Sequence, residues 1–139
     1  TNTVDLTYVD NAAWAHLDAA DALRDPAARC AGRAYFVSND EPVQLWPWTS
    51  AFLERLGLPP LTRKVSLANA QRLGAVLEAA WRWLPLPGEP PMTPFMAVAL
   101  ARSHWYSMAP AKADLGYRVR VPMAEATART AAYFAERNG

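Results

Sequence analysis

The sequence has few of the residue types on which metal and thiol chemistry depend. Its 139 residues include two histidines, His16 and His104, and a single cysteine, Cys30. Two distant histidines and one thiol do not form the close donor set of a zinc site, so no metal site is predicted. One cysteine excludes an internal disulfide and stands in no nucleophile motif. Low cysteine use is typical of a reducing compartment, and we expect a cytoplasmic protein.

Glycine is scarce, and its spacing excludes a dinucleotide-binding turn within this chain. None of the six glycines forms G-x-G, and no G-x-S-x-G elbow occurs. No tyrosine is followed four residues later by lysine; Tyr106 and Lys112 are six apart. The chain therefore contains no complete catalytic set, and we predict no catalytic and no cofactor-binding residue in it.

Excess charge and long apolar runs are also missing. Fourteen basic and 13 acidic residues leave a net charge of +1, so nothing favours nucleic acid or an anionic membrane surface. The longest uncharged segments, 42–53 and 90–101, contain prolines and are shorter than the roughly 20 residues of a transmembrane helix. The first residues lack the pattern of a signal peptide. Because the chain starts with Thr1 and reads at once as a strand, we expect a fragment or a processed piece.

Residues 32–58 carry the clearest structural signal. Tyr, Phe and Val in the segment 33–37 favour a strand, and the polar residues that follow, with Pro42, favour a turn. Leu45, Trp48, Phe52 and Leu56 then recur at helical spacing. This strand–turn–helix unit predicts an α/β fold.

The rest of the chain predicts a helix-rich protein with short strands. Strands are expected at 4–9, 62–65 and 103–107. A helix capped by Asp10 or Asn11 is expected to place Ala13, Leu17 and Ala20 against a sheet. Further helices are expected over 67–83 after a Ser66 cap, over 111–115, and after Pro122. The expected inward residues of the last helix are Met123, Thr127, Thr130 and Phe134.

Three ordered motifs resemble one family. Residues 8–16, YVDNAAWAH, resemble the Y-V-x-N-x-A-W-A-H segment of 3β-hydroxysteroid dehydrogenases and decarboxylating sterol-4α-carboxylate dehydrogenases. Residues 32–42, GRAYFVSNDEP, resemble their G-x-x-[FY]-x-[IV]-[ST]-[ND]-x-x-P segment. The segments 103–107, SHWYS, and 112–117, KADLGY, are similar to the closing pattern of the family. The family also includes bacterial reductases of long-chain 2-alkyl-3-oxo acids.

The resemblance implies an NAD(P)-dependent extended short-chain dehydrogenase. In this family the glycine-rich turn and the Tyr-x-x-x-Lys pair lie in an N-terminal Rossmann part, which has no counterpart here. Residues 1–139 would then be a single C-terminal portion, formed by the last strands of the Rossmann sheet and a small mixed α/β substrate-binding lobe. NAD or NADP would be bound by the full-length protein and not by this chain. Its expected partners are the missing N-terminal half, a hydrophobic substrate and possible further copies of itself.

The first strand narrows the substrate class. Related nucleotide-sugar epimerases have R-D-Y-x-H-V where this chain has VDLTYV at 4–9, and the arginine and tyrosine hold a diphosphate. Val4 and Leu6 cannot neutralise a diphosphate. An apolar wall instead suits a sterol or an acyl chain, whose burial is worth roughly 0.8 kcal/mol per methylene.

Six residues are candidates for contact with substrate: Tyr8, Asp10, Asn11, Trp46, Met92 and Phe95. The first three lie at the carboxyl end of a predicted strand, where ligands gather in α/β sheets. The alternative is that Asp10 and Asn11 only cap a helix and that the methionine and aromatic residues are ordinary core. Trp81 and Trp83 lie on different faces of one predicted helix, and an exposed one could contact a membrane surface or a partner.

The first hypothesis is therefore the substrate-binding part of an oxidoreductase that acts on a hydrophobic secondary alcohol or ketone, a sterol or a long-chain 3-oxo acid. Alone, the chain would be inactive. The second is a stand-alone lipid-binding or protein-interaction module, and the third, which Val4 and Leu6 disfavour, is a nucleotide-sugar enzyme fragment. The sequence does not distinguish NAD from NADP.

Overall fold

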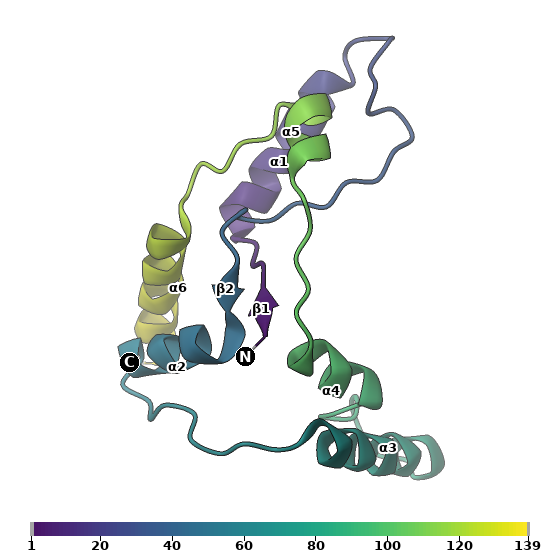
Figure 1. Ribbon diagram of the computed structural model, residues 1–139, viewed down its shortest axis with the longest axis vertical. Coiled ribbons are helices and arrows are strands. Elements are labelled where there is room, and N and C mark those ends of the chain that lie inside the picture. Colours follow the sequence, from purple (N-terminus) through teal and green to yellow (C-terminus); the bar gives the residue numbers. More distant parts are fainter. Residues whose placement is uncertain (1, 139) are drawn as a thin grey trace.

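A computed structural model describes residues 2–138 as a helix-rich chain with one small sheet. The elements follow in the order β1 (Thr3–Val4), α1 (Val9–Ala22), β2 (Val43–Gln44), α2 (Leu45–Arg55), α3 (Leu67–Trp83), α4 (Pro94–Ala101), α5 (Ala109–Leu115) and α6 (Met123–Asn138) (Figure 1). The predicted α/β class with a high helix content is confirmed at this level.

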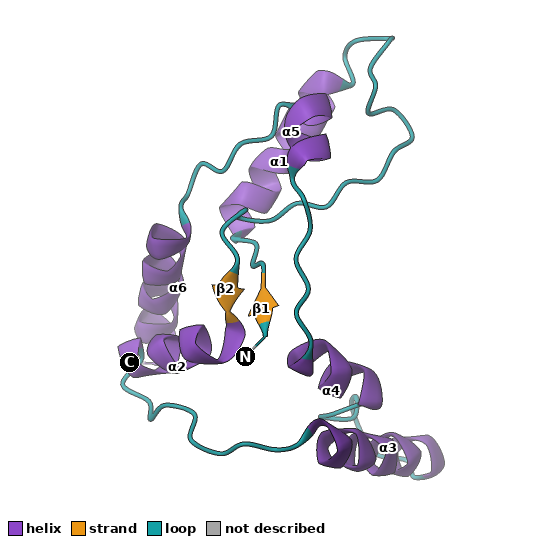
Figure 2. Cartoon of the chain, viewed as in Figure 1, coloured by secondary structure: helices purple, strands orange, loops and turns teal. Residues whose placement is uncertain are grey.

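The helices pack in three pairs rather than around one common core. α1 lies beside α5, α2 beside α6, and α3 beside α4 (Figure 1). Long loops join the pairs, and the α3–α4 pair lies at the opposite end of the molecule from α1 and α5 (Figure 2). The arrangement leaves helix faces uncovered, as the burial pattern also shows.

Three extended segments meet near the middle of the molecule. β1 and β2 pair antiparallel, with Thr3 opposite Gln44 and Val4 opposite Val43. On its other edge Val4 forms a parallel bridge with His104, whose N–H donates to the Thr3 carbonyl at 2.9 Å. This small sheet therefore ties the N-terminal segment to chain that lies about 100 residues away.

The main hydrophobic core lies between α1 and α5. Its buried members are Ala15, Cys30, Met108, Ala111, Leu115 and Tyr117. Gly116 follows α5 with φ +68°, a left-handed value that glycine adopts without steric cost, and this confirms the predicted helix end. The turn lets Tyr117 fold back into the core.

The α3–α4 pair depends on one close approach. An added Cβ on Gly74 would lie 2.6 Å from the carbonyl carbon of Thr93 and 2.7 Å from the nitrogen of Pro94. Both are backbone atoms and cannot move aside cheaply. Glycine at this position thus allows α3 to lie directly against the start of α4.

The predicted strands are largely wrong. Of 4–9 only Val4 is a strand residue, 33–37 and 62–65 are extended loop, and 103–107 contributes only the His104 bridge. A strand requires a neighbouring ladder, and these segments make side-chain contacts instead: Phe36, for example, stacks on Tyr106 with centroids 3.8 Å apart. The Rossmann-sheet arrangement is not tested by two short strands and stays a proposal.

The predicted positions of the helices agree with the structure better than the predicted buried faces do. Helices α2 and α3 begin at Leu45 and Leu67, and Ser66 accepts a hydrogen bond from the Asn69 N–H as its cap. Tyr8, not Asp10 or Asn11, is the N-cap of α1, because that helix begins at Val9.

The predicted inward face of α1 is wrong and that of α6 is partly right. Ala13, Leu17 and Ala20 are exposed, while Asn11 and Ala15 are buried. On α6, Met123 and Thr127 are buried and Thr130 is half-buried, but Phe134 is 43% exposed.

Large apolar side chains are exposed on several elements. The most exposed are Trp83, at 81%, and Phe95, at 80%, both on the α3–α4 pair. In the part of the chain that the structure describes, no helix is long and apolar enough to cross a membrane.

Candidate functional site

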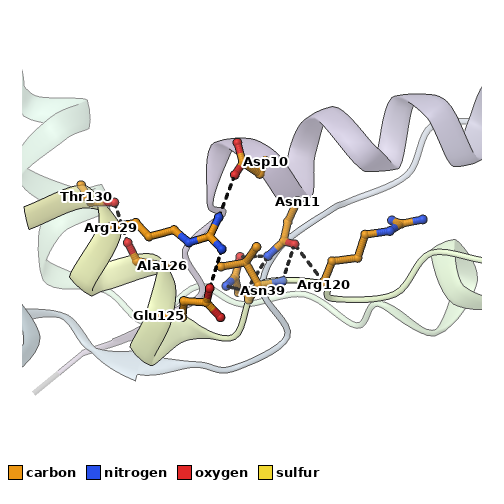
Figure 3. Close-up of polar contacts among 9 residues, drawn as sticks. Asp10, Asn11, Asn39, Arg120, Glu125, Ala126, Arg129 and Thr130 are labelled. Carbon is orange, nitrogen blue, oxygen red and sulfur yellow. Dashed lines mark hydrogen bonds and ion pairs between the residues drawn. The ribbon is translucent and has the colours of Figure 1, made fainter. Parts of the chain in front are cut away.

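Two buried asparagines form the centre of the best-defined polar site. Asn11 on α1 and Asn39 in the loop before β2 are both fully buried. Asn11 Nδ2 donates to Asn39 Oδ1 at 3.0 Å and to the Val121 carbonyl at 2.8 Å, and Asn11 Oδ1 accepts from the N–H groups of Arg120 and Val121, each at 3.0 Å. Figure 3 shows the two amides meeting beside Arg120. This asparagine junction joins three distant segments.

The second asparagine completes the junction. Asn39 Oδ1 also accepts from the Tyr8 N–H at 2.9 Å, and its Nδ2 donates to the Val121 carbonyl at 3.1 Å. The N-terminus of α1 is therefore fixed by a side chain that lies 31 residues away. Every side-chain amide oxygen and nitrogen of the two asparagines has a hydrogen-bond partner, so their burial leaves no amide group unsatisfied.

Beside the junction lies a second buried polar group. Tyr117 is 2% exposed, and its hydroxyl donates to the Ser38 carbonyl at 2.6 Å. Burial first, and the charges of Asp5 and Asp40 next, raise the pKa of the Tyr117 hydroxyl, so it is a neutral donor at neutral pH. Ser38 Oγ in turn donates to Asp5 Oδ2, while Asp5 Oδ1 is buried and has no hydrogen-bond partner among residues 2–138.

Tyr8 and Asp10 lie at the edge of the junction together with a cation from α6. Arg129 donates to Asp10 Oδ2 at 3.4 Å and also to Glu125 (Figure 3). Its pKa is raised, first by the bond to Glu125 and then by the hydroxyl of Tyr8. Both Tyr8 and Asp10 are half-buried. The site thus offers a phenol, carboxylates and a guanidinium within one small region of surface.

An ion pair on the other side of the junction fixes the chain before α6. Arg120 donates to both carboxylate oxygens of Asp18, at 2.7 and 3.0 Å, and its guanidinium lies 4.5 Å from the centre of the Trp14 ring. The hydrogen bonds from Arg120 lower the pKa of Asp18, against an opposing effect of burial.

We expect Asp18→Asn to destabilise the chain at neutral pH and to have less effect in acid. The pKa of Asp18 is lower in the folded than in the unfolded state, so the pair contributes fully above about pH 4 and less as the pH falls below it. Urea unfolding at pH 6.5 and at pH 3 would measure the difference from wild type. Asp21→Asn is the matched control, since its pair with Arg24 is exposed. A difference that stays equal at both pH values would contradict this assignment.

A hollow of about 380 Å³ adjoins the junction. Asn39 and Tyr117 form buried parts of its wall, and Lys112 pairs with Asp40 at its rim. Asp40 has φ 53°, a left-handed value that is uncommon outside glycine. The complete lining is Asn39, Asp40, Glu41, Lys112, Tyr117, Arg118 and Val119.

The six predicted substrate residues do not form one cluster in this chain. Tyr8, Asp10 and Asn11 lie together, but Asn11 is fully buried and holds backbone groups, so it positions the site. Trp46 is 42% exposed on α2. Met92 is half-buried in the loop before α4 and Phe95 is exposed in its first turn. Contact of any of them with substrate remains a proposal.

Sequence reasoning missed several residues of this site. Asn39 was treated only as a turn residue, and Tyr117 only as part of the closing motif. The sequence gives Arg120 no predicted role, and it places Arg129 on the outward face of the last helix. An asparagine that follows a strand-like run is the one local signal that could have indicated Asn39, because asparagine side chains often hold turns.

Helices α1 to α4 begin without the glycine-rich turn of a dinucleotide site. Helices α1 to α4 follow Tyr8, Gln44, Ser66 and Thr93, none of which belongs to a glycine-rich turn that would cradle a pyrophosphate. Within residues 2–138, no group of three or more His, Cys, Asp or Glu side chains is placed to hold a metal ion.

Comparison with known proteins gives a consistent family. Residues 1–68 match the 3-beta hydroxysteroid dehydrogenase/isomerase family. The chain is 46% identical over 129 residues to a 2-alkyl-3-oxoalkanoate reductase of Stenotrophomonas maltophilia, covering 93% of this chain and 39% of that protein. It is 44% identical over 126 residues to the reductase of the same name from Shewanella oneidensis, covering 91% and 33%.

More distant relatives act on sterols by name. A mouse sterol-4-alpha-carboxylate 3-dehydrogenase is 32% identical over 135 residues, covering 96% of this chain and 37% of that protein. No solved structure matches. The chain spans about a third to two fifths of the length of these relatives. The resemblance predicted from the motifs is confirmed: the chain is similar to the 3-beta hydroxysteroid dehydrogenase/isomerase family over residues 1–68 and to these reductases and dehydrogenases over most of its length.

Proposed function

We propose that this chain is the substrate-binding, C-terminal part of an NAD(P)-dependent oxidoreductase. The observation that carries the proposal is the 46% identity, over 93% of the chain, to a 2-alkyl-3-oxoalkanoate reductase of which it spans 39%. The catalytic tyrosine–lysine pair and the cofactor site would lie in the N-terminal part. This chain would bind and orient the substrate.

The proposed substrate is a hydrophobic 3-oxo acid or its 3-hydroxy partner. Two relatives' names, 2-alkyl-3-oxoalkanoate reductase and sterol-4-alpha-carboxylate 3-dehydrogenase, share one chemical pattern. In both, the carbon that carries the reacting oxygen is bonded to the carbon that bears the carboxylate. The higher identity to the reductases favours a 2-alkyl-3-oxo acid over a sterol.

Polar and apolar residues of this chain would bind different parts of this substrate. Tyr8 and Asp10 are half-buried polar residues beside the junction, and the junction holds the start of α1 in place through the Tyr8 N–H. Trp46, Met92 and Phe95 supply apolar surface for an alkyl chain, with Phe95 the most exposed. Asn11 would contribute indirectly, because its side chain holds the backbone of Arg120 and Val121 in place.

A second candidate is a stand-alone lipid-binding or protein-interaction module. The exposure of Trp83 and Phe95 on the α3–α4 pair is the observation that favours it. Tight binding of a fatty acyl or sterol probe by this chain without a nicotinamide cofactor would support the module. Binding of the same probe only when the proposed N-terminal part is present would support the oxidoreductase.

Sequencing the coding DNA upstream of Thr1 tests the proposal. We expect an open frame that encodes G-x-x-G-x-x-G near its start and Y-x-x-x-K before this chain. Those motifs, which do not occur in residues 1–139, would supply the dinucleotide turn and the catalytic tyrosine–lysine pair. A start codon at or next to Thr1, with neither motif upstream, would contradict the oxidoreductase proposal and leave the binding module.

A further inference from the structure

A second hollow, separate from the asparagine junction, lies between α2 and α6. Its volume is about 190 Å³. The rings of Trp48 and Phe52 stack along one wall, with centroids 5.4 Å apart and planes inclined by 9°. The complete lining is Trp48, Ala51, Phe52 and Arg55 of α2 and Met123, Ala124 and Thr127 of α6. We call it the α2–α6 groove.

Apart from the Arg55 guanidinium, the polar side-chain atoms in the wall of the groove are already paired. Trp48 Nε1 donates to Thr127 Oγ1 at 3.3 Å, and Thr127 Oγ1 donates to the Met123 carbonyl at 2.7 Å. A ligand inside the groove therefore gains apolar contact and displaces no hydrogen bond of the protein. Alkyl groups suit such a surface, because their burial is favourable and needs no polar partner.

Arg55 is the one charged residue in the lining. Within residues 2–138 its guanidinium has no ion-pair partner, and no carboxylate lines the groove. By contrast, the hollow beside the junction has Asp40 and Glu41 next to its cations. An arginine at the edge of an apolar surface matches a ligand with one carboxylate, which a guanidinium can bind through two parallel hydrogen bonds.

We propose that the α2–α6 groove binds the alkyl chain of an aliphatic monocarboxylate, with Arg55 holding the carboxylate. This site is distinct from the proposed substrate site. On α6 the groove residues Met123 and Thr127 face α2, whereas Glu125 and Arg129 reach toward α1 and Asp10 (Figure 3). The proposal therefore stands whether or not the chain belongs to an oxidoreductase.

Octanoate is the probe for this site, and 1-octanol is its uncharged counterpart. Titration of each into the ¹⁵N-labelled chain would be followed at the indole N–H of Trp48, identified by its loss in Trp48→Phe. Saturable movement of that resonance by octanoate is expected, with 1-octanol binding at least about tenfold more weakly, which is about 1.4 kcal/mol. Acetate, which has the charge but no chain, should not move it.

Two variants test the charge of Arg55 and the space inside the groove separately. Arg55→Gln should weaken octanoate to the level of octanol and leave octanol unchanged. Ala51→Phe should fill the groove and abolish binding of both, while far-ultraviolet circular dichroism confirms that the fold is kept. Arg72→Gln, an exposed arginine on α3, is the matched control and should bind like wild type.

Any one of the following results would overturn the proposal. They are the absence of a saturable shift with octanoate, equal affinities for octanoate and 1-octanol, and retention of the preference for octanoate in Arg55→Gln. An equal loss in Arg72→Gln would show that total charge, and not the groove, attracts the acid.

Discussion

Replacing Asn11 with alanine should lower the free energy of unfolding of this chain by about 3–5 kcal/mol. The side chain is fully buried, and its oxygen accepts from two backbone N–H groups, those of Arg120 and Val121. Without it both groups lose their partner, and each unsatisfied buried donor costs about 1–3 kcal/mol. Asn39 Oδ1 also loses one of its two donors. Urea unfolding followed by tryptophan fluorescence would measure the loss.

Asn69→Ala is the control for Asn11→Ala. Asn69 is exposed on α3, so its replacement should change the free energy of unfolding by no more than about 0.5 kcal/mol. Asn11→Asp adds a second test. It places a carboxylate oxygen near the Val121 carbonyl and Asn39 Oδ1, so its pKa should rise and the variant should lose stability as the pH increases. A stable Asn11→Ala chain would contradict the structural role of the junction.

Replacing Phe95 with serine should separate activity from stability in the full-length protein. The side chain is 80% exposed, so its loss should change the free energy of unfolding by no more than about 0.5 kcal/mol. If Phe95 covers the alkyl chain of the substrate, kcat/KM should fall about 10- to 100-fold, because burial of a phenylalanine is worth about 1.5–3 kcal/mol. The measurement is kcat/KM for 2-alkyl-3-hydroxy acids of different chain lengths.

The effect of Phe95→Ser should grow with the length of the alkyl chain. Phe134→Ser on α6 is the matched control, since Phe134 is also exposed but is not a predicted substrate residue. It should leave kcat/KM unchanged. An equal fall in kcat/KM for short and long substrates, or no fall, would contradict the placement of Phe95 against the chain.

Helices could be predicted from the sequence because their signals are local. Ser66 supplies an N-cap, so α3 was predicted with its first residue correct, and the apolar stripe from Leu45 to Leu56, which ends before Gly57, predicted the helix α2. Gly116 ended α5 as predicted. Each of these signals lies within a few residues of the feature that it specifies.

Strands and helix faces could not be predicted in the same way. A strand depends on a neighbour that can lie far along the chain: Val4 pairs with Val43 and bridges to His104. The segment 33–37 has strand-forming residues and remains an extended loop. On α1 the apolar residues suggested one inward face, but Asn11 is drawn inward by Arg120 and Val121, which lie more than 100 residues away in the sequence.

The candidate site was half predicted for the same reason. Tyr8, Asp10 and Asn11 were predicted because they stand between an expected strand and an expected helix, and the structure brings them together with Asn39. Nothing local connects Asp10 to Arg129, which lies 119 residues further along the chain. Trp83 was identified from its place on a predicted helix and Phe95 from its place after the proline-rich segment, but their distance from α1 is a property of the three-dimensional fold (Figure 1).

The most direct test of the central claim is an assay of the full-length gene product for oxidation of a long-chain 2-alkyl-3-hydroxy acid. Appearance of NADH or NADPH at 340 nm would follow transfer of hydride from the alcohol carbon to NAD⁺ or NADP⁺, with release of a proton. The proposed function predicts a signal that depends on the acid and is absent when residues 1–139 are assayed alone. A full-length product that reduces neither cofactor with this acid or with a sterol-4α-carboxylate, or a signal from the 139-residue chain alone, would contradict it.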